Sequence, residues 1–162
     1  MKIRQARPDE AHLVAHVLTA AAARLAEQGQ LLWDATHVGE AAVEAQVRAG
    51  DYHLAFDGDE AVGTFLFQLE DRVFWPEMTE GSSAFMHKLA VLPAWRGRGV
   101  AQLLLAHAGE LARQRGRTHL RLDCEGGRPG LRAVYERFGF RHHSERQFGK
   151  QLFHRFELEV AP

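Results

Sequence analysis

The sequence predicts a single α/β domain with a mixed, mostly antiparallel sheet of about seven strands flanked by four helices. Two observations support this fold class. Segments with the period of an amphipathic helix alternate with segments whose apolar residues recur at every second position. No repeat, low-complexity tract or linker interrupts residues 1–162, a length that suits one domain with a substantial core.

The N-terminal part of the chain predicts one strand followed by two helices. Residues 2–5 form a short β-rich run, and residues 8–29 follow a helical period. Pro8 suits the first turn of this helix and Gly29 suits its end. A second, shorter helix is expected over residues 40–49.

The middle of the chain predicts three strands. Two β-rich runs within residues 52–70 flank Asp57-Gly58-Asp59, which is a strong hairpin signal. Residues 71–83 are irregular. Residues 84–92 are almost continuously apolar, which predicts a strand near the centre of the sheet.

The C-terminal part predicts two helices and three strands. Helical patterns cover residues 98–115 and 129–139, and alternating patterns cover residues 118–124, 140–147 and 151–160. The predicted order of elements is therefore β-α-α-β-β-β-α-β-α-β-β.

Charge and composition argue against several classes of protein. A formal net charge of −1 gives no overall field that favours nucleic acid or a membrane surface. The lone Cys124 suits a reducing compartment, and the N-terminus lacks the apolar core of a secretory signal. The longest apolar stretch, residues 11–26, is too polar and too short to span a bilayer. We therefore expect a cytoplasmic protein. The ten histidines are scattered, so we expect no metal site.

Residues 93–105, PAWRGRGVAQLLL, place two arginines and two glycines at the start of a helix. The first turn of a helix leaves backbone N–H groups without partners and carries a partial positive charge. Glycines let an anion approach these groups, and arginine donates bidentate hydrogen bonds to phosphate oxygens. The stretch therefore predicts a phosphate cradle, although a glycine-rich turn with solvated arginines has the same pattern. A Walker-type nucleotide site is excluded because the Gly-Lys-Ser/Thr ending is absent.

Two longer stretches resemble the GNAT acetyltransferase superfamily. HKLAVLPAWRGRGVAQLLLAHA, from residue 87, is similar to the acetyl-CoA-binding signature of that family, in which Arg/Gln-x-x-Gly-x-Gly/Ala follows a strand and opens a long helix. LRLDCEGGRPGLRAVYERFGF, from residue 120, is similar to the later strand and helix and to the Tyr-Glu-x-x-Gly-Phe motif. With FWPE, these stretches resemble a bacterial subgroup. The predicted element order matches the family along nearly the whole chain.

The resemblance implies transfer of an acetyl group from acetyl-CoA to a primary amine. It also implies that the strands over residues 84–92 and 118–123 splay apart, and that the pantetheine arm pairs with backbone between them. A backbone N–H near Val91 would then donate to the thioester oxygen. The residues that the resemblance places at the cofactor are Leu89, Ala90, Val91, Arg96, Gly97, Arg98, Gly99, Val100, Ala101, Arg128 and Leu131.

Arg128 departs from the family pattern, which commonly has asparagine at this position. An asparagine amide contacts the pantetheine, whereas arginine cannot accept a hydrogen bond, so that contact is changed or lost. Arg128 therefore either reaches a phosphate of coenzyme A or is a solvated surface residue.

Tyr135 and His87 are the candidates for proton transfer. Tyr135 matches the family tyrosine that donates to the sulfur of coenzyme A; the alternative is a core aromatic residue on an amphipathic helix. His87 either accepts a proton from the acceptor amine, directly or through water, or has a structural role. The family often has an acidic base at the position of Phe85, which phenylalanine cannot replace. Glu70 and Asp123 are weaker candidates for the base, and water alone is a further route.

The acceptor is expected near residues 33–36 and 71–83. An aromatic wall for it would be formed by Trp33, Phe74, Trp75 and Phe85, and nearby carboxylates would attract a cation. We expect a small amine with an apolar part, and a protein N-terminus or lysine side chain is the alternative within this class of enzyme. The alternative outside it is a catalytically silent domain that senses acyl-CoA. Exposed edge strands have unpaired backbone groups that can pair with a second copy of the chain, so a homodimer is possible.

Overall fold

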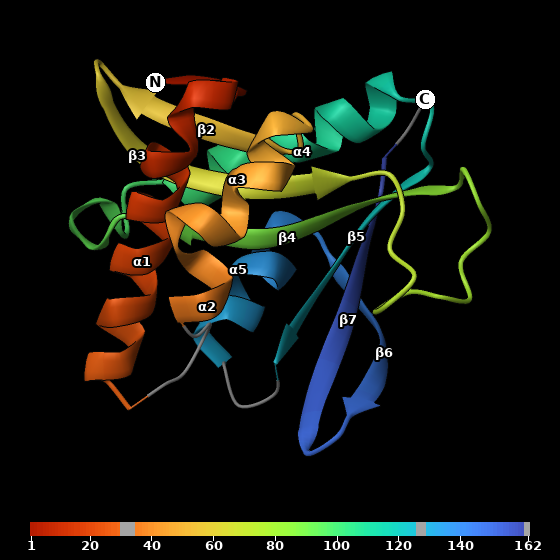
Figure 1. Ribbon diagram of the computed structural model, residues 1–162. Helices are drawn as coiled ribbons and strands as arrows, with labels where there is room; N and C mark the ends of the chain where they lie inside the picture. The colour runs from red at the N-terminus through yellow and green to blue at the C-terminus, as the bar shows by residue number, and fades with distance from the viewer. Residues whose placement is uncertain (30–34, 126–128, 161–162) are drawn as a thin grey trace. The chain divides into compact units, whose positions relative to one another are not determined.

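The computed structural model describes residues 1–29, 35–125 and 129–160 (Figure 1). The chain groups into two compact units, and each unit combines two stretches of the sequence. Unit 1 contains Met1–Leu66 and Lys88–Leu104, and unit 2 contains Phe67–His87 and Leu105–Pro162.

The described residues form seven strands and five α-helices. The strands are β1 (Lys2–Gln5), β2 (Tyr52–Asp57), β3 (Glu60–Gln68), β4 (Ser83–Val91), β5 (His119–Glu125), β6 (Arg141–Phe148) and β7 (Gln151–Glu159). The helices are α1 (Ala11–Glu27), α2 (Ala35–Val38), α3 (Glu40–Arg48), α4 (Val100–Gln114) and α5 (Pro129–Phe138). Two 3-10 turns, η1 (Pro8–Glu10) and η2 (Pro93–Trp95), complete them. The sequence predicted all of these strands and four of these helices; the single turn of α2 was not predicted.

The strands form one open, mixed sheet in the hydrogen-bonded order β1-β2-β3-β4-β5-β7-β6. β4 and β5 are parallel, whereas the registered pairs β1–β2, β2–β3, β5–β7 and β6–β7 are antiparallel. The register of β4 with β5 joins Ser83–Met86 to His119–Leu122. The mixed sheet, with β4 between β3 and β5, confirms the predicted fold class.

In unit 1, α1 and α3 pack against each other (Figure 1). The apolar residues that repeat along one side of each helix are buried; these are Val14, Val17, Leu18, Val43 and Val47. Complete burial of one such side chain contributes about 1.5–3 kcal/mol to the stability of the fold. These buried residues therefore stabilise both helices, although the outer faces of the helices are polar.

Gly63 of β3 allows the start of α4 to approach that strand closely. A Cβ atom at this position would lie 2.9 Å from Leu104 Cδ1, 3.1 Å from Val100 Cγ1 and 3.4 Å from the carbonyl oxygen of Ala90. A glycine inside a strand often marks such a close approach. The position of the first turn of α4 therefore depends on the missing side chain at residue 63.

In unit 2, β6 and β7 form a long hairpin that turns at Gly149, whose φ is 55° (Figure 1). The register shifts between His142 and Ser144, so β6 contains a β-bulge with His143 as the extra residue. A bulge changes which side chains share a face of the sheet.

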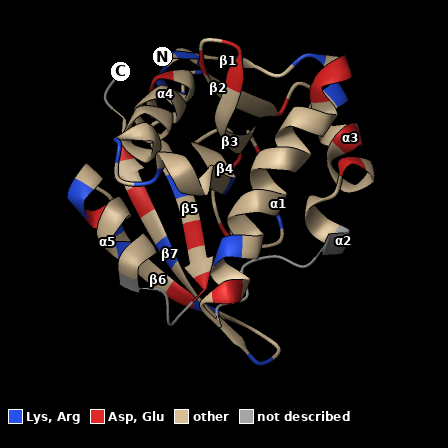
Figure 2. Ribbon diagram, turned by 90° about the vertical axis from the view of Figure 1, so that its left-hand side faces the viewer, with Lys and Arg blue, Asp and Glu red and all other residues tan. Residues whose placement is uncertain are grey.

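Charged residues occur along β5 and β7 (Figure 2), and two arginines among them are buried. Arg121 is 7% exposed and ion-pairs with Glu157, and Arg155 is only 5% exposed. Arg155 donates to the carbonyl oxygen of Phe74 at 2.8 Å and to Oε1 of Glu77 at 2.7 Å. These pairs offset the cost of burying the charge, and they fasten the segment from Phe74 to Glu77 to β7.

The start of α4 differs from the prediction because glycine sets it. The helix begins at Val100 rather than at residue 98, since Gly99 has a φ of 83°, outside the helical range.

Among the helices of residues 1–29, 35–125 and 129–160, none combines the length and the apolar character that a membrane crossing needs.

Candidate active site

The predicted phosphate cradle lies in unit 1, between η2 and α4. Gly97 and Gly99 have φ angles of 75° and 83°, and a Cβ atom built on either glycine would meet no other atom within 4 Å. The loop is therefore bare backbone with open space beside it. The helix that follows has 15 residues, and its first N–H groups have no carbonyl partners within the helix. This combination fits a diphosphate group.

The arginines of the loop are exposed, as an anion site requires. The guanidinium carbon of Arg98 lies 4.5 Å from the centroid of the Trp95 ring, and Trp95 Nε1 donates to Glu60 Oε1 at 2.9 Å. A cation held on an indole ring loses less side-chain freedom when it binds a ligand. Trp95 is therefore a positioning residue for Arg98, a role that sequence reasoning missed.

The end of β4 carries an unusual backbone angle. Lys88 has a φ of 54°, which is rare for a residue other than glycine. Such a conformation costs on the order of 1–3 kcal/mol and often occurs at functional sites. It comes directly before Leu89, Ala90 and Val91, whose backbone was predicted to bind the pantetheine arm. No pattern in the sequence indicated this angle.

In unit 2, His87 lies between two carboxylates, and we call Asp71, His87 and Asp123 the histidine cluster. His87 Nε2 is 3.0 Å from Asp71 Oδ2, and His87 Nδ1 is 3.6 Å from Asp123 Oδ2. The side chains are 17%, 6% and 9% exposed for His87, Asp71 and Asp123. The sequence predicted His87 and weighed Asp123, but it missed Asp71 as a partner of His87.

Burial acts to raise the pKa of Asp71, but hydrogen bonds outweigh it. The hydrogen bond from His87, the charge of that ring and the backbone N–H groups of Phe74 and Val73 together lower the pKa below its ordinary value of 3.8. Asp71 is therefore a carboxylate near neutral pH. In the cluster it faces one ring nitrogen while Asp123 faces the other. One ligand atom from each of Asp71, His87 and Asp123 lies within 4.8 Å of the other two, and the two carboxylates on opposite sides of the ring also suit proton transfer through it.

Phe74 lies beside His87 and packs with two other half-buried phenylalanines, and we call Phe74, Phe148 and Phe153 the phenylalanine cluster. The ring of Phe74 is 4.8 Å from that of Phe148, 5.1 Å from that of Phe153 and 5.9 Å from that of His87. This is an apolar surface adjacent to a titratable group. The sequence drew attention to Phe74, but the two residues of the β6–β7 hairpin were missed.

Tyr135 lies on α5 in unit 2 and is 4% exposed. Its ring centroid is 5.9 Å from that of Phe140 and 6.0 Å from that of Phe156. Its carbonyl oxygen accepts hydrogen bonds from the N–H groups of Gly139 and Phe140, at 3.2 and 3.0 Å, which end the helix. The Tyr-Glu-x-x-Gly-Phe motif is therefore also a helix-ending motif.

The predicted aromatic wall needs correction. Trp75 and Phe85 are only 2% and 4% exposed, so neither ring offers an accessible surface to an acceptor. Trp75 is covered by arginines, with the guanidinium carbons of Arg155 and Arg121 at 4.5 and 5.1 Å from its ring centroid. Trp75 is a packing residue in this structure. Of the other predicted contacts, Leu131 lies on α5 and is half-buried, and Trp33 and Arg128 lie outside the described residues.

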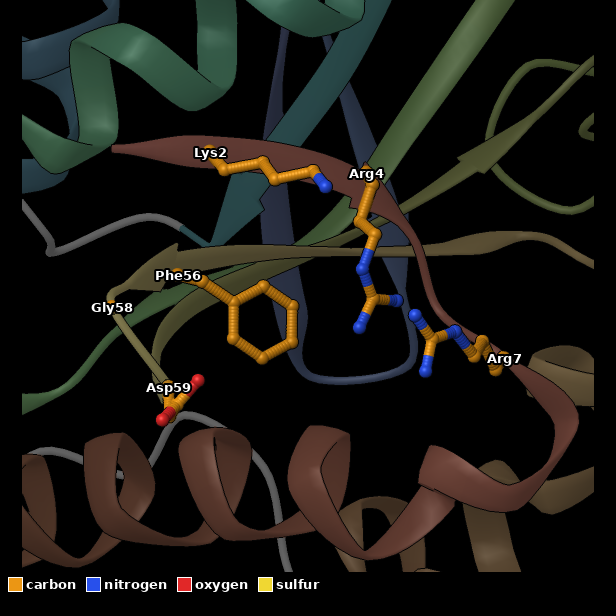
Figure 3. Close-up of a pocket in the computed structure, with 6 residues that line it drawn as sticks. All are labelled: Lys2, Arg4, Arg7, Phe56, Gly58 and Asp59. Carbon is orange, nitrogen blue, oxygen red and sulfur yellow. The ribbon is translucent and has the colours of Figure 1, made fainter.

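A pocket of about 280 Å³ in unit 1 contains none of the predicted site residues (Figure 3). It is lined by Lys2, Arg4, Arg7, Phe56, Gly58 and Asp59. Arg4 donates to both carboxylate oxygens of the buried Glu10, at 2.9 and 2.7 Å, and Arg7 lies 3.9 Å from the same carboxylate. The carboxylates of Glu10 and Asp59 offset two of the three positive charges of Lys2, Arg4 and Arg7, and we assign the pocket no role.

Known proteins with related sequences and folds are acetyltransferases. The Bacillus subtilis (strain 168) protein named uncharacterized N-acetyltransferase YesJ is 24% identical over 160 residues, which cover 94% of this chain and 87% of that protein. A GNAT-family acetyltransferase from Listeria monocytogenes 4b F2365 has a TM-score of 0.80 at 20% identity, covering 98% of this chain and 94% of that one. The yncA protein of Salmonella typhimurium, solved with its cofactor acetyl-CoA, has a TM-score of 0.75 at 16% identity, covering 100% and 95%.

The structural likenesses, all at low identity, establish the fold. The sequence match to the model of the acetyltransferase (GNAT) family extends over residues 18–140, which is most of the chain. This range includes the bare loop before α4, the histidine of β4 and the tyrosine of α5. The chain therefore belongs to the GNAT family and is an acyl-CoA-dependent acetyltransferase.

Proposed function

We propose that the protein transfers the acetyl group of acetyl-CoA to the primary amine of a small molecule with an apolar part. The observation that carries this proposal is the bare backbone from Gly97 to Gly99 at the start of α4, in a chain of the acetyltransferase family. The histidine cluster and the phenylalanine cluster support the choice of acceptor.

The residues of unit 1 fit the cofactor. Backbone N–H groups at the start of α4 would donate to the diphosphate oxygens, and Arg96 and Arg98 would neutralise their charge. The backbone from Leu89 to Val91 would pair with the amides of the pantetheine arm. A backbone N–H near Val91 would stabilise developing charge on the thioester oxygen, an effect worth about 3 kcal/mol for one donor. Acetyl-CoA supplies the acetyl group as a thioester, which an amine nitrogen attacks directly.

The histidine cluster supports a route for the proton of the acceptor amine. A neutral His87 donates its Nε2–H to Asp71 at 3.0 Å, which leaves the lone pair of Nδ1 facing Asp123. A proton taken from the ammonium group then arrives at Nδ1, and Asp123 stabilises the resulting imidazolium. Asp71 holds the ring in the tautomer that accepts the proton, as the carboxylate of a catalytic triad does.

Tyr135 is the proposed donor of the second proton, from its phenolic oxygen to the departing sulfur. The family motif supports this role, and the packing of the ring against Phe140 and Phe156 holds the side chain in one orientation. A phenol has a higher ordinary pKa than a thiol, so a hydrogen bond to the sulfur is favourable even where transfer is incomplete.

The phenylalanine cluster supports an acceptor with an apolar part. Its rings are half-buried and that of Phe74 lies beside His87, so an amine that packs on Phe74 brings its nitrogen toward the proposed base. Burying about 100 Å² of apolar surface on such rings contributes about 2.5 kcal/mol. A polyamine or a polar peptide would gain little from this surface.

Titration calorimetry with coenzyme A tests the cofactor assignment. Gly99→Asp places a charge and a side chain in the open loop, and it should weaken binding at least about tenfold. Gly149→Asp is the matched control, since Gly149 also has a positive φ and open space around it. The control should bind like the wild type. Unchanged affinity in a folded Gly99→Asp protein overturns the assignment of the loop.

Release of free thiol from acetyl-CoA, measured with a panel of amines, tests the acceptor. Faster turnover of aromatic and aliphatic primary amines than of polyamines or peptides supports the proposal. A preference for peptides would instead indicate a protein N-acetyltransferase. Tight binding of coenzyme A without turnover of any amine would indicate a sensor.

A further inference from the structure

Two histidines and one glutamate meet on the β6–β7 hairpin, outside the site described above. His142 Nε2 lies 3.2 Å from His154 Nδ1, and His154 Nδ1 lies 3.7 Å from Glu145 Oε1. One ligand atom from each side chain lies within 4.8 Å of the other two. His142 and Glu145 are exposed, so an ion from solvent can reach them.

The β-bulge at His143 creates this arrangement. Glu145 is directly opposite His154 in the register, so their side chains share a face of the sheet. In a regular strand, His142 would point to the other face, because it is three positions, an odd number, from Glu145. The extra residue shifts the alternation and aligns His142 with Phe156, two residues from His154 on the same face. Bulges often re-aim a side chain in this way beside functional sites.

The distance between the two nitrogens fits a shared metal ion. Bonds of about 2.0–2.1 Å from one ion to two imidazole nitrogens at a tetrahedral angle place the nitrogens about 3.3 Å apart. The observed separation of 3.2 Å is close to this value. The carboxylate oxygen, at 3.7 Å from His154 Nδ1, comes into range with a small rotation of the exposed Glu145 side chain.

We propose that His142, Glu145 and His154 form a binding site for a divalent transition-metal ion, with Zn²⁺ as the ion that suits them best. Two imidazoles and one carboxylate are ligands that Zn²⁺ accepts, and water completes the coordination. The site joins β6 to β7, so a bound ion stabilises the hairpin. The spacing of the histidines in the sequence did not indicate it, since the ligands come from two strands and the bulge changes their faces.

The histidine cluster around His87 also brings three possible ligand atoms within 4.8 Å of one another. It offers one imidazole, and its side chains are at most 17% exposed, whereas the hairpin offers two imidazoles and two exposed side chains that an ion can reach from solvent. On α1, His12 and His16 are both exposed and one helical turn apart. This pair provides the matched control.

Calorimetric titration of the metal-free, untagged full chain with Zn²⁺ tests the proposal. The wild type should bind one ion. His154→Gln and Glu145→Gln should each raise the dissociation constant for Zn²⁺ about tenfold or more. In other metal sites, loss of a residue that merely supports a ligand already lowers metal affinity by roughly 10–100-fold. His16→Gln should bind like the wild type. Zn²⁺ should raise the melting temperature of the wild type and of His16→Gln, but not that of His154→Gln.

Two results would overturn the proposal. One is a wild type that takes up no Zn²⁺ under these conditions, and the other is loss of binding in His16→Gln with retention in His154→Gln. A melting curve of each variant without metal shows that it is folded. Substitution with Co²⁺ gives a second measurement, because a site with nitrogen and oxygen ligands produces visible absorption bands that His154→Gln should lose.

Discussion

Asp71 Oδ2 lies 3.0 Å from His87 Nε2, while Oδ1 of the same carboxylate accepts the backbone N–H groups of Val73 and Phe74 at 3.0 and 2.9 Å. One side chain thus holds both the ring of His87 and the turn that carries Phe74. The proposed base and the apolar surface beside it are therefore coupled through a single carboxylate.

Asp71→Asn should lower kcat about tenfold or more, because the amide no longer selects the tautomer of His87. The lowered pKa of Asp71 reflects attraction between its charge and that of the ring. Removal of this charge makes the imidazolium less favourable, so the acidic limb of the pH–rate profile should move to lower pH. Glu80→Gln, an exposed carboxylate on the same connection, is the control and should leave the profile unchanged. A normal profile in Asp71→Asn would remove this residue from the mechanism.

Tyr135→Phe should lower kcat about 10–100-fold and change the dissociation constant of coenzyme A by less than about twofold, since it removes only the proposed proton donor. Steady-state kinetics together with calorimetry separate the two quantities. Tyr52→Phe, at the other tyrosine of the chain, is the matched control and should retain full activity. Equal turnover by both variants contradicts the role of Tyr135.

Tyr52→Phe should also raise the free energy of unfolding by about 1 kcal/mol, because the buried hydroxyl of Tyr52 has no hydrogen-bond partner among the described residues. Burial raises the pKa of Tyr52 above its ordinary value of 10.0. The unfolded chain therefore releases this proton first, and stability should fall as the pH rises above 10.0. Urea unfolding of both proteins should show a smaller alkaline loss for Tyr52→Phe. The same loss in both would contradict the assignment.

Gly63→Ala should weaken binding of coenzyme A several-fold and destabilise the fold by about 1–3 kcal/mol, since the new Cβ atom would push against the buried Leu104 and Val100 at the start of α4. Gly109→Ala, inside the same helix, is the control. Its Cβ atom would lie 3.8 Å from the nearest atom outside the helix, Val160 Cγ1, so the change should stabilise the protein by about 0.5–1 kcal/mol. Unaltered cofactor affinity in Gly63→Ala would show that the cradle tolerates movement of the helix.

Glu10→Gln should destabilise the protein by about 2 kcal/mol, since it breaks a paired hydrogen bond with Arg4 and a bond from the N–H of Arg7. The hydrogen bond from Arg4 is the main cause that lowers the pKa of Glu10 below 4.5. Its contribution to stability is therefore present above pH 4.5 and is lost as the pH falls through the lower, folded-state value. Acid unfolding measured by circular dichroism should show this loss in the wild type only.

Glu44→Gln is the control for that experiment. Its exposed pair with Arg48 on α3 should contribute less than about 0.5 kcal/mol. If Glu44→Gln destabilised the protein as much as Glu10→Gln, burial of Glu10 would not make its ion pair with Arg4 stronger than the exposed pair of Glu44 with Arg48.

The sequence by itself determined the order of the elements, the central strand and the loop before α4. Each of these depends on a pattern within about 20 neighbouring residues, such as a period of 3.6 or 2 or a glycine that ends a helix. The hairpin at Asp57-Gly58-Asp59 and the glycines of the cradle were recognisable for the same reason.

Only the tertiary structure decided which of these residues meet. Asp71 and His87 come together from a connection and a strand, and a one-residue bulge brings His142 to the face of Glu145 and His154. Trp75 is buried under Arg155 while its neighbour Phe74 stays half-exposed beside His87. Register and burial depend on strands that are distant in sequence, so local periodicity carries no information about them.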